Sequence, residues 1–166
     1  MSNLVGLLAA VGIGLLIGLE RGWRQRDEHA GGRIAGIRTY ALLALGGALS
    51  GLLALNVSIW FGLIGIGGII VALLLAHRAR LAEADDNVSA TNVVVSILTV
   101  LLGLAMTAGF LREAIVVGGV MSLILSLREQ LHGWLRTLSA EDVRAVAIYG
   151  AITFVVLPLL PDKNIG

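Results

Sequence analysis

The 166-residue chain has no cysteine, only two prolines, few aromatic residues and few charged ones. The absence of cysteine excludes disulfide scaffolds, iron–sulfur clusters and thiolate zinc sites. Charged residues make up 14% of the chain, whereas a soluble domain has about 25%. The formal net charge of +1 gives no reason to expect nucleic-acid binding. Because hydrophobic residues make up 57% of the sequence, the composition predicts a protein whose main solvent is lipid.

Six stretches are apolar enough to cross a bilayer. They are residues 4–19, 39–55, 59–76, 93–111, 114–127 and 145–160. A spanning helix needs about 20 residues, within a range of about 17–25. Each span should be α-helical, because unpaired backbone groups are too costly in hydrocarbon. The sequence therefore predicts an all-α, polytopic membrane helix bundle with about six transmembrane helices, forming a single domain over residues 1–166.

The basic residues are distributed unevenly between the predicted loops. Ten of the twelve lie at residues 21–38, 77–91 and 128–144, on one side, and only Arg112 and Lys163 lie on the other. Lysine and arginine are retained in the cytoplasm, so we expect the N-terminus and the end after the sixth span to lie outside. Three spans followed by three spans have opposite orientations, which leaves an inverted three-plus-three arrangement open.

Small residues recur at intervals of four in the first two spans, a pattern that lets helix backbones approach closely in a membrane. The candidate packing residues are Gly14, Gly18 and Gly22 in the first span, Gly47 and Gly51 in the second, and Gly36 just before it. Two interpretations stay open for the ridge on the first span: packing within one chain, or the seam of a homodimer.

A polar cluster closes the first span at the boundary between lipid and water. Glu20 and Arg21 stand in its last turn, and Arg38 and Thr39 open the second span on the same membrane face. A carboxylate at this depth is costly unless it is paired or binds a cation. We therefore expect Glu20 either to approach Arg38 or to serve as a cation ligand.

Asp85 and Asp86 form a second candidate cation site, in the loop before the fourth span. Mg²⁺ prefers oxygen ligands and retains several waters, although capping of the following helix is the simpler interpretation of this stretch. Magnesium is the cofactor considered, at Glu20, Asp85 and Asp86. The sequence contains no nucleotide-binding loop, zinc-protease motif or nucleophile elbow, so we do not expect an enzyme.

The region after the fifth span contains two local signals. Residues 131–142 are typical of a short interfacial helix, with Trp134 on its apolar face. Ser139 followed three residues later by Asp142 resembles a capping box, with Asp in place of the usual Glu. The pair predicts that the next helix begins just after Ser139.

The runs GLERGWRQR (residues 18–26) and RIAGIRTYALLALGGAL (residues 33–49) resemble the N-terminal signature of the MgtC/SapB membrane-protein family. The resemblance is specific over residues 12–48. It is greatest to a longer branch in which an MgtC-like half precedes a hydrophobic half of unknown function. The family's motif positions fall on Gly18, Glu20, Arg21, Gly36, Arg38 and Thr39.

The resemblance implies a multi-pass protein of the bacterial inner membrane that takes part in magnesium homeostasis as a regulator or accessory protein. A secondary transporter or channel for Mg²⁺ or another small cation is the alternative, and a structural assembly module is a third hypothesis. The expected partners are the lipid bilayer, another membrane protein and a second copy of the chain.

Overall fold

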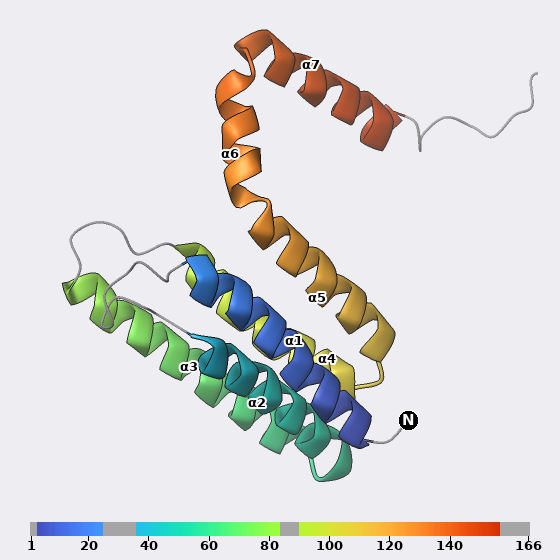
Figure 1. Cartoon of the computed structure of the whole chain (residues 1–166). Coiled ribbons are helices and arrows are strands. Elements are labelled where there is room, and N and C mark those ends of the chain that lie inside the picture. The colour runs from blue at the N-terminus through green and yellow to red at the C-terminus, as the bar shows by residue number, and fades with distance from the viewer. Residues whose placement is uncertain (1–2, 25–35, 84–89, 157–166) are drawn as a thin grey trace, which may run out of the picture. The chain divides into compact units, whose positions relative to one another are not determined.

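The computed structural model describes residues 3–24, 36–83 and 90–156, which form helices joined by short turns (Figure 1). The helices are α1 (Asn3–Arg24), α2 (Ile37–Asn56), α3 (Ile59–Glu83), α4 (Ala90–Thr107), α5 (Leu111–Ser126), α6 (Arg128–Thr137) and α7 (Ala140–Ala151), followed by a π-helical turn, η1 (Ile152–Val156). No strand occurs in these segments. The described chain is therefore all-α, as predicted.

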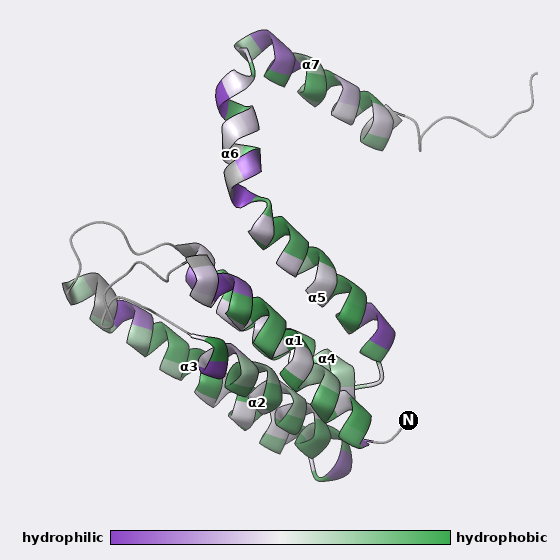
Figure 2. Cartoon of the chain, viewed as in Figure 1, coloured by the Kyte–Doolittle hydropathy of each residue, from purple (hydrophilic) through white to green (hydrophobic). Residues whose placement is uncertain are grey.

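Among the described helices, three are long and apolar enough to cross a membrane, judged by length and composition. The spans are Asn3–Trp23, Ile37–Asn56 and Ile59–Ala79, and they match the first three predicted runs. Shorter apolar helices follow in α4 and α5, and Figure 2 shows hydrophobic residues along α1–α5 with hydrophilic ones near the helix ends. These features confirm a membrane helix bundle. The last predicted span begins in α7 and continues through η1, and its remaining residues lie outside the described part of the chain.

Two compact units make up the chain, Met1–Ser126 and Leu127–Gly166, where the sequence predicts a single domain. The boundary falls where the apolar run of α5 ends and the charged start of α6 begins. It does not separate the first three helices from those that follow, because α4 packs on α1, α2 and α3. The inverted three-plus-three arrangement stays a prediction.

In the first unit, α2 packs against α1, α3 and α4. Its contact with α4 brings backbone against backbone: a Cβ on Gly47 would overlap the carbonyl oxygen of Val100, and one on Gly103 would overlap that of Ala44. Lipid gives helices no hydrophobic reason to associate, so van der Waals contact at such close approach holds them together. The two glycines make the α2–α4 contact reciprocal.

The glycine ridge of α1 packs against α2 within the same chain. A Cβ on Gly14 would lie 2.6 Å from the Tyr40 carbonyl oxygen, and one on Gly18 would lie 2.7 Å from the Ile37 Cα. Farther along the ridge, Gly22 is in ordinary contact with Ile37, at 3.5 Å from its Cγ1. Gly14 and Gly18 therefore pack against α2 of the same chain, which is the first of the two interpretations of this ridge.

Two other glycines of the predicted packing set behave differently from each other. A Cβ on Gly51 would overlap the Thr107 hydroxyl oxygen of α4, so this position extends the α2–α4 contact. A Cβ on Gly36 would meet nothing within 4 Å. Gly36 precedes α2 as its N-cap residue and so does not lie on the packed face of a helix.

The second unit contains α6, α7 and η1. The start of α7 is the predicted capping box: the Asp142 backbone N–H donates to the Ser139 hydroxyl oxygen at 3.1 Å, and the Ser139 N–H donates to an Asp142 carboxylate oxygen at 2.9 Å. The preceding helix ends at Thr137 because Leu138 is extended. The short helix expected at residues 131–142 is therefore α6, which begins and ends earlier than predicted.

Candidate functional site

Polar side chains gather at one end of the first unit, which we call the basic end. Here α1 and α3 end and α2 and α4 begin (Figure 1). Its described side chains include Arg21, Arg38 and Arg78. Trp23 is 69% exposed in the last turn of α1, where an aromatic side chain suits the membrane interface.

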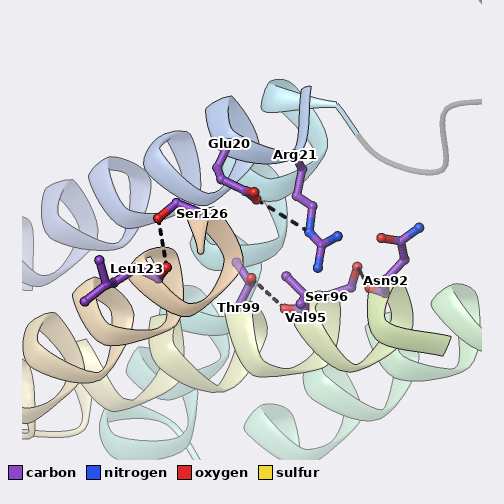
Figure 3. Close-up of polar contacts among 8 residues, drawn as sticks. All are labelled: Glu20, Arg21, Asn92, Val95, Ser96, Thr99, Leu123 and Ser126. Atoms are coloured by element: carbon purple, nitrogen blue, oxygen red, sulfur yellow. Dashed lines mark hydrogen bonds and ion pairs between the residues drawn. The ribbon is translucent and has the colours of Figure 1, made fainter. Parts of the chain in front are cut away.

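Among the described side chains at this end, Arg21 is the most deeply buried charged residue, with 6% of its surface exposed. Its side chain runs from α1 toward Asn92 and Ser96, in the first two turns of α4 (Figure 3). The Nε atom lies 3.8 Å from Glu20 Oε2, which makes an ion pair too long for a hydrogen bond. Nε and Nη2 are buried, and within the described segments neither has a hydrogen-bond partner. Such donors are costly to bury without an acceptor.

Arg21 thus lies beside Glu20, whose side chain is 14% exposed. Arg38 is exposed at the start of α2, and its approach to Glu20 stays a prediction. Tyr40 is 1% exposed and marks the inward face of α2. Successive residues of an α-helix are about 100° apart, so Arg38 lies about 200° around the axis from Tyr40 and faces away from the bundle. Thr39 is exposed as well.

The wall of α4 that faces Arg21 carries three buried polar residues: Asn92, Ser96 and Thr99. The Ser96 hydroxyl donates to the Asn92 carbonyl oxygen, and the Thr99 hydroxyl to the Val95 carbonyl oxygen, each at 2.8 Å. The buried Tyr40 side chain of α2 lies near Ser96. The hydroxyls of Ser96 and Thr99 are therefore satisfied by backbone carbonyls of α4 itself.

Of the three candidate metal ligands, only Glu20 belongs to the described residues. Asp85 and Asp86 lie outside them. Glu20 is in the described part, where no group of three or more His, Asp or Glu side chains could hold a metal ion together. A cation at Glu20 would have to compete with the guanidinium of Arg21, 3.8 Å away. Mg²⁺ is usually bound through one or two carboxylates with several retained waters, so Glu20 alone is a weak ligand set.

The burial of Arg21 and the position of Tyr40 near it are not among the predictions from the sequence. The helical period could have indicated the burial of Arg21, because Ala10, Gly14, Ile17 and Arg21 recur at intervals of four, three and four. All four are buried and share one face of α1. The structure thus brings together Glu20, Arg21, Tyr40, Asn92, Ser96 and Thr99, a set that shares only Glu20 and Arg21 with the cluster predicted from the sequence.

Comparison with known proteins identifies the family. The MgtC family model matches residues 7–134, which include nearly all of α1, the whole of α2–α5 and most of α6. No curated protein and no solved structure gives a match. The family ties its members to membranes and to magnesium homeostasis, and the apolar helices of the bundle agree with the first of these. The chain belongs to the MgtC family.

Proposed function

We propose that this protein is a multi-pass protein of the bacterial inner membrane that regulates or assists magnesium homeostasis by contacting another membrane protein through its basic end. Its family supports the link to magnesium. The observation that carries the regulatory role is the contrast between the closed interior of the bundle and its charged end. Glycines seal α2 against α4, and the buried hydroxyls are taken up by backbone carbonyls. In contrast, three of the described arginines of the first unit, Arg21, Arg38 and Arg78, lie at the basic end.

Several side chains at the basic end are exposed and could contact a partner. Arg38 and Thr39 are exposed at the start of α2, and Trp23 is 69% exposed at the end of α1. Arginine and tryptophan are enriched in the energetically dominant parts of protein interfaces. An acidic surface on the partner, near the headgroups, would complement this end.

Transport of Mg²⁺ is the second candidate, and one observation favours it. The buried residues Asn92, Ser96 and Thr99 form a polar stripe that leads from the Glu20–Arg21 pair into the span of α4. A cation path needs oxygen ligands that can exchange. In this stripe the hydroxyls are engaged with α4 carbonyls, which is why regulation is the preferred proposal.

A flux assay separates the two functions. The purified chain would be placed in proteoliposomes, and Mg²⁺ uptake compared between the wild type and Glu20→Gln. Regulation predicts no uptake above that of empty vesicles. Uptake that disappears in Glu20→Gln would instead establish transport and overturn the proposal.

Co-purification from native membranes tests the contact itself. The expected result is a membrane-protein partner that is lost in Arg38→Ala and kept in Arg78→Ala, a matched exposed arginine at the end of α3. A partner that binds both variants as well as the wild type would contradict docking through the start of α2.

A further inference from the structure

The short helix α6 carries its large apolar residues on one side. Leu131, Trp134 and Leu135 lie at positions i, i+3 and i+4, which places them within an arc of about 100° around the helix axis. The C-cap residue Leu138 follows at i+7. All four side chains are exposed, Trp134 by 67%, and we call them the apolar face of α6. Arg136 lies on the opposite side, about 150° from the middle of this arc.

No other described helix of the second unit covers the apolar face. Among the described residues of that unit, helix contacts lie between α7 and η1, and α6 packs against neither. The helix ends at Thr137, so the polar residues after Leu138 do not interrupt this face. A contiguous exposed apolar surface marks a site that meets another protein or a membrane. The cover of the apolar face is therefore lipid or protein.

The position of α6 along the chain ties it to a membrane surface. The preceding helix, α5, ends at the basic end, because Leu125 in its last turn lines the same apolar groove between α4 and α5 as Thr91 in the first turn of α4. A single residue, Leu127, separates α5 from α6, so the Cα atoms of Ser126 and Arg128 lie within about 8 Å of each other. The helix α6 therefore begins at the membrane surface of the basic end.

The length of α6 rules out a crossing of the membrane. Its 10 residues correspond to about 15 Å at about 1.5 Å per residue, which is half of a hydrocarbon core of about 30 Å. Only Leu138 and Ser139 lie between α6 and α7, where the last predicted span begins. A short helix between two apolar segments stays at the surface where the first of them ends.

The side chains of α6 suit this surface. Tryptophan is enriched where membrane meets water, and Trp134 belongs to the apolar face. Arg128 and Arg136 lie near the two ends of the helix, and an arginine keeps its charge among the headgroups while its aliphatic stem covers apolar surface. Amphipathic helices of this kind lie in the plane of the interface, with the apolar face buried about 5–10 Å into the boundary between headgroups and acyl chains. A lipid surface therefore fits the apolar face.

We propose that α6 lies along the membrane surface at the basic end, with its apolar face on the acyl chains of that leaflet. Arg136, on the opposite side, then faces the headgroups and water. The partner of this surface is the lipid bilayer rather than a protein. This inference goes beyond the proposed function and holds whether the protein regulates or transports.

Spin labelling of the full chain in nanodiscs tests the orientation of α6. Because the chain contains no cysteine, a single substitution gives one labelled position. Labels at Leu131→Cys and Leu135→Cys should be relaxed strongly by oxygen, which concentrates in lipid, and weakly by a water-soluble nickel chelate. Labels at Gly133→Cys and Arg136→Cys, on the opposite side, should show the reverse. Val71→Cys is the reference for the hydrocarbon interior, since Val71 is exposed near the middle of the α3 span.

The oxygen-to-nickel ratio at Leu131 and Leu135 should fall between that of Val71 and that of the opposite side. A ratio equal to that of Val71 would place α6 inside the hydrocarbon, and four equally water-accessible labels would place it in solution. Shielding of Leu131 and Leu135 from both reagents would show that protein covers the apolar face. Each of these three results would overturn the proposal.

Two charged variants test whether the apolar face holds α6 at the surface. Leu135→Glu puts a carboxylate on this face, at a side chain that is 62% exposed, so packing within the chain is kept. It should lower the ratio at a Leu131→Cys label to that of the opposite side. Gly133→Glu is the matched control on the opposite side, where a Cβ meets nothing within 4 Å, and should leave the ratio unchanged. An equal ratio in the two variants would overturn the proposal.

Discussion

The fourth helix, in the first unit, and the seventh, in the second, depend on different interactions. The first of these, α4, buries one face against its neighbours, with Val100 and Thr99 fully buried and Gly103 against the backbone of α2. By contrast, α7 has no buried residue and begins with a complete capping box between Ser139 and Asp142. Tertiary contacts therefore hold α4 in place, whereas hydrogen bonds between residues three apart in the sequence define the start of α7. Substitutions should affect the two regions on different scales.

The largest effect is expected where two backbones touch. Gly103→Leu should prevent α2 and α4 from packing and abolish folding of the first unit, because even a Cβ would overlap the Ala44 carbonyl oxygen. Gly119→Leu, on α5, is the control, since a Cβ there meets nothing within 4 Å. Size-exclusion chromatography and thermal unfolding in detergent would measure the difference. Similar behaviour of the two variants would show that the α2–α4 contact is not tight.

The second unit should respond to loss of its cap instead. Ser139→Ala removes the hydroxyl that accepts from the Asp142 N–H, and such a change at an N-cap costs about 1 kcal/mol, within about 0.5–2 kcal/mol. The first turn of α7 should fray, seen as a loss of helical Cα chemical shifts by NMR, while α1–α5 stay unchanged. Ser139→Asp should restore the cap. Equal helicity of the alanine variant and the wild type would mean that α7 does not depend on it.

An interhelical hydrogen bond should contribute less than either of these. The Thr107 hydroxyl donates to the Ala48 carbonyl oxygen at 2.9 Å, from α4 to α2. Thr107→Val removes this bond and should lower the stability of the first unit by about 0.6 kcal/mol, with about 1.7 kcal/mol as the upper end for such bonds in membranes. Thr99→Val, whose hydroxyl bonds within its own helix, should cost less. Denaturant unfolding in mixed micelles compares them, and a larger loss for Thr99→Val would contradict this ranking.

The smallest effect is a dependence on pH confined to the start of α7. Hydrogen bonds from the Ser139 backbone N–H and hydroxyl lower the pKa of the exposed Asp142 carboxyl below its usual value of 3.8. A carboxyl whose pKa is lowered by folding stabilises the folded form above the unfolded pKa, and this contribution is lost as pH falls through the folded pKa. The cap should therefore be complete at neutral pH and weaken only below about pH 4. A carboxyl ¹³C titration of Asp142 would show this, and a midpoint above 3.8 would contradict it.

In both regions the sequence predicts local features better than contacts between helices. The first three spans and the start of α7 agree with prediction, because both depend on neighbouring residues: long apolar runs in one case and the Ser139–Asp142 spacing in the other. The position of Arg21 beside Glu20 and the outward position of Arg38 are not part of the sequence prediction. The second depends on the rotation of α2, which Tyr40 reveals by its burial.

The sequence by itself determines that this chain is a helical membrane protein. It also determines approximately where the longest apolar helices begin and end, and which of their ends is rich in arginine. Composition and local hydrogen bonding suffice for these properties. Only the tertiary structure decides that Gly47 lies against Val100 and Gly103 against Ala44, that the guanidinium of Arg21 is buried against α4, and that a groove opens beside α5. Each of these depends on the relative rotation and register of helices separated along the chain, and packing of whole helix faces sets both.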